Sequence, residues 1–307
     1  MCLFSGMAQQ AALQLICGRS ETPEITPTAD NLVRYSDFNM TFHMFSLRQQ
    51  ALAVVLASDP DLKARLARTA PIDAMSGAEL ELPPPAGIPG RPVLPRLVAH
   101  NTLKKRSITT LEGRAALLHS LAHIELNAID LAADAVWRFA GMPDAYYRDW
   151  IQVMQEEALH FELLRDHLQT LGYAYGDFDA HNALWEMAER TQHDVLARIA
   201  LVPRTMEARG LDASPAVRHK LASVGDAAGA AILDTILRDE IGHVLVGNRW
   251  YGWLCAQRGL EPVSTYAALT VQYRAPRLRG PFNVAARTAA GFSVEELEAL
   301  DAQAAQA

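Results

Sequence analysis

Two Glu-x-x-His motifs carry residue types that could do chemistry together: Glu157 with His160, and Glu240 with His243. Residues three apart share one face of a helix, so the carboxylate and the imidazole of each motif can point at one place. Both motifs, and a lone carboxylate at Glu125, lie on otherwise apolar helical stripes. A buried ionised carboxylate costs several kcal/mol unless it is paired or bound to a metal. The pattern therefore predicts a shared metal site.

The spacing of these glutamates predicts their height in a bundle and points to a fourth ligand. Glu125 and Glu157 are 32 residues apart with the turn at Gly141 midway, so an antiparallel hairpin would bring them level. Glu207 precedes Glu240 by 33 residues and lies on an apolar stripe. Four glutamates and two divalent metals balance in charge, and one Glu from each of two helices with Glu-x-x-His from two others is the ligand set of di-iron bundles.

The choice of Glu207 leaves alternatives. Gly210 is expected to end the helix soon after it, so residues 215–223 would have to continue the rod as a short helix after a kink. Asp194 and Glu189 are the competing carboxylates in this part of the chain. We favour Glu207, because its spacing matches that of the first pair.

Four further residues near the motifs have two interpretations each. Asp239 and Glu156 directly precede the motif glutamates and could accept a hydrogen bond from the outer nitrogen of a ligand histidine; the alternative is a solvated helix flank. His119 and His123 lie four apart and could imitate a metal pair. They project away from the Glu125 stripe, which favours a surface or helix-packing role.

Two other groups could take part in chemistry but have plainer interpretations. Arg274, Arg277 and Arg279 form a basic cluster that could contact an anionic substrate, although a solvated loop or a salt-bridge anchor is the simpler interpretation. Tyr173 and Tyr175 are expected to pack a loop rather than to act as redox residues. No nucleophile elbow, phosphate loop or dinucleotide fingerprint is present.

The elements that must position these residues are predicted to be helical throughout, giving an all-α fold. Thr109 with Glu112 fits a capping box at the start of the first long helix, and Ser293 with Glu296 fits another near the end of the chain. Residues 172–180 are expected to form a crossover loop. Four long helices are predicted, over about 109–141, 145–171, 181–209 and 226–258, with the third kinked at Pro203.

The chain is predicted to have three parts. Residues 1–108 form an N-terminal extension, with one amphipathic helix over about 46–70 and a connector over 71–95 that holds seven of the sixteen prolines. Residues 109–258 form a four-helix bundle with a long crossover between its second and third helices. Residues 259–307 form a segment that packs on the bundle.

Composition narrows the classes of function. Half of the 307 residues are hydrophobic and 21% are charged, as in globular proteins. The net charge of −7 provides no general basic field for nucleic acid. Cys2, Cys17 and Cys255 make neither a disulfide scaffold nor a thiolate zinc site, which favours a reducing cytoplasm. We expect no signal peptide and no membrane-spanning helix.

The chain resembles the ferritin-like superfamily of dimetal carboxylate proteins over roughly residues 109–258. More narrowly, it is similar to an uncharacterised bacterial ferritin-like family that is distantly akin to the tRNA hydroxylase MiaE. The matching stretches are HSLAHIELNAIDLA, EEALHFELLRDHLQTLGYAYGD, EARGLD, RDEIGHVLVGNRWY and, near the end, GPFNVAARTAAGF. The resemblance implies six metal ligands: Glu125, Glu157, His160, Glu207, Glu240 and His243.

The resemblance also implies two metal ions, with iron expected and a manganese–iron pair as the alternative, and O₂ as co-substrate. We therefore expect an O₂-activating oxidase or oxygenase, with hydroxylation as the reaction, acting on a small molecule or a modified nucleoside with an unidentified electron donor. The acidic balance gives nucleic acid no support, and the helix faces are compatible with a homodimer. The alternative is a ferroxidase or iron-binding protein without an organic substrate, a role that the long terminal segments disfavour because they obstruct cage packing.

Overall fold

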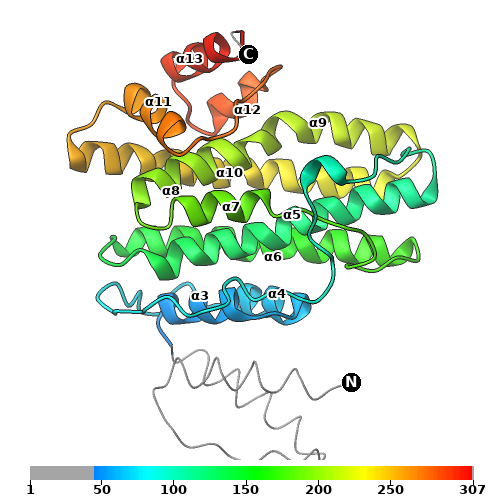
Figure 1. Ribbon diagram of the computed structural model, residues 1–307, viewed down its shortest axis with the longest axis horizontal. Coiled ribbons are helices and arrows are strands. Elements are labelled where there is room, and N and C mark those ends of the chain that lie inside the picture. Colours follow the sequence, from blue (N-terminus) through cyan, green and yellow to red (C-terminus); the bar gives the residue numbers. More distant parts are fainter. Residues whose placement is uncertain (1–44, 306–307) are drawn as a thin grey trace, which may run out of the picture. The chain divides into compact units, whose positions relative to one another are not determined.

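The computed structural model describes residues 45–305, and every regular element in this range is a helix (Figure 1). The only strand-like pairing there is an isolated bridge between Leu97 and Ala180. The all-α prediction is confirmed. The N-terminal residues on which the signal-peptide prediction depends, with Cys2 and Cys17, lie outside the described range. The elements are α3 (Leu47–Leu56), α4 (Pro60–Thr69), η1 (His100–Thr102), α5 (Leu111–Arg138), α6 (Asp144–Thr170), α7 (Ala183–Arg190), α8 (Val195–Leu201), η2 (Val202–Glu207), α9 (Ala208–Ser223), α10 (Ala227–Arg258), α11 (Pro262–Gln272), α12 (Val284–Ala289) and α13 (Val294–Ala305).

The described chain divides into two compact units. One comprises residues 45–93 and 128–159, and the other comprises residues 94–127 and 160–305. Helices α5 and α6 each contribute to both units. None of the helices in the described range is long and apolar enough to cross a membrane.

Buried cations hold the first unit together. Lys63 of α4 donates hydrogen bonds to the carbonyl oxygens of Val54 and Val55 at 3.2 and 3.3 Å and forms an ion pair with Asp130 of α5. Burial lowers the pKa of Lys63, and burial raises the pKa of Asp130 to about 6. Arg48 of α3 donates to the carbonyl oxygen of Trp137 through Nη2 at 2.6 Å. These contacts fasten α3 and α4 to α5.

The single helix predicted over 46–70 is two helices, which is a correction. Helix α3 ends at Leu56, and Asp59 caps α4 by accepting a hydrogen bond from the backbone N–H of Leu62 at 2.7 Å. Pro60 occupies the first turn of α4, where its missing N–H costs nothing. The residue before a proline is also disfavoured in helical conformation, so the Asp59–Pro60 pair starts a new helix. Residues 71–95 contain no helix, as the prolines predicted.

The first two long helices lie close to their predicted bounds, as α5 and α6. The start of α5 differs in its cap. The hydroxyl of Thr110 accepts from the N–H of Gly113 at 3.1 Å, while Glu112 pairs with Arg106 at 2.9 Å instead of closing a capping box with Thr109. The capping box at Ser293 and Glu296 is present, with hydrogen bonds of 2.9 and 3.2 Å.

The third long helix is interrupted, contrary to the prediction of one helix over 181–209. Helix α7 ends at Arg190, and Asp194 caps a new helix, α8, by accepting from the N–H of Leu196 at 3.0 Å. The chain then passes through a π-helical turn, η2. Pro203 lies at its start, and a proline ring clashes with the carbonyl of the fourth residue before it. The wider π turn relieves that clash.

Helix α9 continues where we predicted a break. It passes through Gly210 and contains Pro215, so neither residue ends it. Pro215 cannot donate to the carbonyl of Leu211, one turn earlier. The Asn283 side chain compensates, because its Nδ2 donates to that carbonyl at 3.1 Å. A distant residue thereby satisfies the backbone group that the proline leaves open.

Helix α10 packs closely against α8, η2 and α9 (Figure 1). It ends at Gly259, which adopts φ 63°, the left-handed conformation that glycine favours at a helix C-terminus. Gly247 permits close approach of η2, since a Cβ atom there would lie only 2.9 Å from Cβ of Pro203. The absence of a side chain at Gly247 thus sets the distance between α10 and the π turn.

Replacing Gly247 by Ala should therefore destabilise the protein, by about 1–3 kcal/mol, because Pro203 cannot move as a flexible side chain would. Gly252, also in α10, is a matched control because a Cβ atom added there would have no atom within 4 Å beyond its own helical turn. Gly252→Ala should stabilise the helix by about 0.5–1 kcal/mol. Denaturant unfolding measures both changes, and equal effects of the two variants would contradict the close packing.

Candidate metal centre

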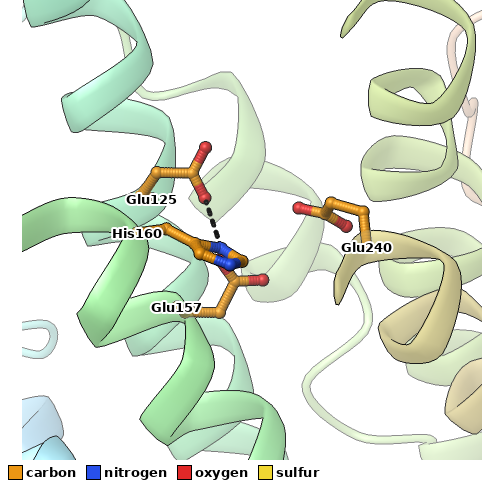
Figure 2. A group of neighbouring side chains, drawn as sticks. All are labelled: Glu125, Glu157, His160 and Glu240. Atoms are coloured by element: carbon orange, nitrogen blue, oxygen red, sulfur yellow. Dashed lines mark ion pairs between the residues drawn. The ribbon is translucent and has the colours of Figure 1, made fainter. Parts of the chain in front are cut away.

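Three carboxylates and one imidazole converge in the core of the helices. Ligand atoms of Glu125, Glu157, His160 and Glu240 all lie within 4.8 Å of one another (Figure 2). All four residues are buried: Glu157 and His160 are fully enclosed, and Glu240, the most accessible, is 8% exposed. Four of the six ligands implied by the resemblance therefore form one group.

Three helices present these side chains. Glu125 comes from α5, Glu157 and His160 from α6, and Glu240 from α10. Glu157 lies one turn before His160, so the helix itself sets their relative position. The apolar stripe predicted around them is buried as well, with Phe161 fully enclosed. Helix periodicity therefore brings polar ligands to positions that would otherwise be core.

The two ring nitrogens of His160 have different surroundings. Nδ1 lies 3.7 Å from Oε2 of Glu125, the ion pair dashed in Figure 2. Nε2 donates to Oδ2 of Asp239 at 3.1 Å. Burial opposes ionisation of Asp239, but hydrogen bonds from Arg238 and His160 hold its pKa below the ordinary value. Asp239 thus orients the imidazole and leaves Nδ1 facing the carboxylates.

His243, the histidine of the second motif, lies beside this group but is not part of it. It is 1% exposed, and its Nδ1 is 3.8 Å from Oε2 of Glu240. The rings of His160 and His243 have centroids 5.7 Å apart. The imidazoles of both motifs therefore occupy the same region of the core.

Glu207 ends the π turn η2 and is half-buried, with Oε2 enclosed. Its height follows from the pairing of α9 and η2 with α10. Arg204 bonds Asn248, and Arg218 pairs with Asp234 at 3.0 Å, which is the register of an antiparallel pair. In that register Glu207 lies opposite Leu245, two residues after the second Glu-x-x-His motif. It does not belong to the group of four whose ligand atoms converge within 4.8 Å.

The competing carboxylates have other roles. Asp194 caps α8 and forms an ion pair with Arg258 at 2.9 Å. Glu189 is exposed on α7. Glu156, which the sequence offered as an acceptor for a ligand histidine, accepts a hydrogen bond from Gln152 at 3.0 Å. Asp194 and Glu189, like Glu207, do not belong to the converging group.

His119 and His123 are both buried, which rules out the surface interpretation, and both contact the loop that follows α6. Nε2 of His119 accepts from the N–H of Gly176 at 3.0 Å, and its ring stacks on Tyr175 at 5.2 Å. Nδ1 of His123 is 2.8 Å from the Tyr175 hydroxyl. Tyr175 also meets Phe161, the residue after His160, edge-on at 5.4 Å. These contacts hold the loop against α5 and α6.

The sequence analysis did not predict that the loop would contact His119 and His123 close to the Glu and His group. The signal that could have found them is the concentration of aromatic residues in residues 173–178 opposite two histidines of α5. The basic cluster lies elsewhere: Arg274, Arg277 and Arg279 are exposed, and none belongs to the converging group.

Comparison with known proteins identifies a family and one similar protein. Residues 56–298 match the family described as "Protein of unknown function (DUF455)". The chain belongs to this family. An uncharacterised protein of Haemophilus influenzae is 44% identical over 273 residues, covering 84% of this chain and 95% of that relative. No solved structure matches the chain significantly.

Asp239→Ala should weaken metal binding about 10–100-fold, because it removes the acceptor that orients His160. Affinity for ferrous or manganous ion can be measured by competition with a chromophoric chelator. Asp234→Ala is the matched control, since Asp234 lies on the same helix and pairs with Arg218 at the surface. Unchanged affinity in Asp239→Ala would contradict the orienting role.

His119 should make stability depend on pH. Burial lowers its pKa to about 4, although Asp177 opposes the shift. An unfolded histidine titrates near 6.5, so the unfolded chain binds the proton first and stability falls as pH drops from about 6.5 towards 4. Between pH 7 and pH 5 this group should cost about 2 kcal/mol. The loss should be absent in His119→Phe, as urea titrations at both pH values would reveal; the same pH dependence in both proteins would contradict it.

Proposed function

We propose that this chain is a ferritin-like dimetal carboxylate enzyme that uses O₂ to oxidise an organic substrate, with hydroxylation as the reaction. The observation that carries the proposal is the buried convergence of Glu125, Glu157, His160 and Glu240 within 4.8 Å. Carboxylate oxygens and a neutral imidazole form a donor set suited to iron or manganese. Like charges this close favour a cation among them.

We propose that the site holds two metal ions rather than one. Glu157 with His160 and Glu240 with His243 repeat one motif on two helices, and the imidazoles are neighbours, with centroids 5.7 Å apart. Glu125 and Glu207 would supply the remaining carboxylates, the latter from the segment that pairs with α10 just after the second motif. This set supports the ferritin-like bundle, whose ligands come from four helices in this arrangement. The kinship with the tRNA hydroxylase MiaE rests on the same motifs and leaves a modified nucleoside among the substrates.

Each side chain would have a defined task in such a centre. The glutamates would hold and neutralise the two cations, and His160, oriented by Asp239, would offer Nδ1 as a ligand. The chemistry that a bound iron pair would supply here is the reduction of O₂. Burial of the ligands keeps bulk water away from the site. Substitution of a ligand should therefore abolish metal binding without unfolding the helices.

Elemental analysis of protein purified without added metal or chelator tests the proposal. We expect about two irons, or one iron and one manganese, per chain, and loss of at least one in Glu157→Ala and His160→Ala with unchanged helical circular dichroism. Asp166→Ala, an exposed carboxylate on the same helix, is the control and should keep full occupancy.

The outcomes separate the alternatives. No transition metal after anaerobic reconstitution with ferrous iron, or full occupancy in Glu157→Ala, would contradict the metal centre. Continued uptake of iron far beyond two per chain would favour the ferroxidase alternative. O₂ consumption that stops after the bound iron is oxidised, and resumes only with reductant, is the result expected of an enzyme.

A further inference from the structure

A cavity of about 290 Å³ opens among η2, α11, the segment between α11 and α12, and α13, within the second unit. None of the residues that line it belongs to the converging Glu and His group. Its interior is apolar, with Val263 and Ala267 from α11, Leu278 from the segment before α12, and Ala299 and Leu300 from α13. The volume is about twice the ~150 Å³ that accommodates benzene, so a body of two fused six-membered rings fits inside.

The two arginines in the cavity wall already have carboxylate partners. Arg204 donates through Nη2 to Oε1 of Glu296, and its Nη1 is shielded from the cavity, so no ligand atom reaches it. Arg287, fully buried, forms a two-point ion pair with Asp212 at 2.7 and 3.0 Å. Because both positive charges are balanced inside the protein, neither is free to pair with an anionic ligand.

Glu261 is a carboxylate of the lining that has no cation partner among the described residues. It caps α11, and its two oxygens accept hydrogen bonds from the N–H groups of Val263 at 2.9 Å and Ser264 at 2.7 Å. Hydrogen bonds from the backbone of Ser264 and Val263 lower the pKa of Glu261, so the group is ionised at neutral pH. Since Glu261 is exposed and also lines the cavity, its charge lies where the cavity meets solvent.

The helices around this mouth carry charges of the same sign. Helix α13 presents Glu295, Glu298 and Asp301 at exposed positions and contains no lysine or arginine, and α11 contains no charged residue. The exposed arginines between α11 and α12 do not line the cavity. The positive end of the α11 dipole offsets only about half an elementary charge. An ammonium group at the mouth is therefore attracted, whereas a carboxylate there is repelled.

We propose that this cavity binds a monocationic amine, whose apolar body fills the interior while its ammonium group stays at the mouth beside Glu261. The ammonium keeps most of its hydration there, as the charged end of a lysine does when its stem covers apolar surface. The apolar walls supply most of the affinity, and Glu261 selects the sign of the head group. The proposal does not rest on the metal centre, because the two share no residue.

Three probes with one apolar body test the ligand class on the full chain: 1-aminotetralin, 1-tetralol and tetralin-1-carboxylate. At pH 7 their head groups are an ammonium, a neutral hydroxyl and a carboxylate. Titration calorimetry at low salt should give affinities in that order, with the amine about two- to fivefold tighter than the alcohol, the range expected of one exposed ion pair. That advantage should shrink towards one in ~1 M salt, because screening removes it. Equal binding of amine and alcohol at low salt, tightest binding of the carboxylate, or no binding of any probe would overturn the proposal.

Glu261→Gln tests the recognising group. It removes the charge and keeps an oxygen that can cap α11, so the ratio of amine affinity to alcohol affinity should fall to about one. Weaker capping would lower both affinities together and leave their ratio unaffected. Glu298→Gln is the matched control, since Glu298 is exposed on α13 outside the lining, and it should keep the wild-type ratio. A wild-type ratio in Glu261→Gln would overturn the role of this carboxylate.

A pocket-filling variant tests the location. Ala267→Leu adds volume inside the cavity and should weaken binding of 1-aminotetralin by about tenfold or more. Ala268→Leu is the matched control, since the neighbouring residue is exposed and does not line the cavity. Binding that survives Ala267→Leu unchanged, in a variant with wild-type circular dichroism, would overturn the assignment to this cavity.

Discussion

Electrostatic repulsion among carboxylates in a dry interior is the constraint on which the rest of the structure depends. Glu125, Glu157 and Glu240 are almost wholly shielded from water, and their oxygens approach one another and His160 within 4.8 Å. Helix packing alone would not select glutamate at such positions, because an apolar residue would be cheaper to bury. The helices around them must therefore be held firmly enough to keep these groups together.

Contacts in both units help to hold these helices in place. In the first unit, Lys63 and Asp130 form a buried ion pair between α4 and α5. In the second, Gly247 lets the π turn approach α10, and the neighbouring Arg204 is enclosed by aromatic rings. These contacts use charge and close backbone approach rather than more apolar surface. The ion pair joins α4 to α5, and the close approach at Gly247 joins the π turn to α10.

The sequence was sufficient for the helical class and for the convergence of side chains on unbroken helices, because a period of 3.6 residues places Glu157 and His160 on one face wherever the helix lies. It was insufficient where the outcome depended on distant partners. Pro215 remains helical only because Asn283 completes the hydrogen bonding of α9. Pro60 indicates a break after Asp59. The apolar pattern continues across this point, which is why a single helix was predicted there. The π turn has no periodic signal of its own.

The bond from Asn283 to Leu211 also bears on how this chain can be divided. Asn283 caps α12 through its side-chain oxygen and serves α9 through its amide nitrogen, so one side chain belongs to two helices at once. The sequence suggests a boundary at Gly259. A recombinant fragment that stopped there would leave the carbonyl oxygen of Leu211 without the Asn283 donor and Asp212 without its ion pair to Arg287. The carboxyl-terminal residues thus stabilise α9, and shortening the protein there would disturb the helix that packs against α10.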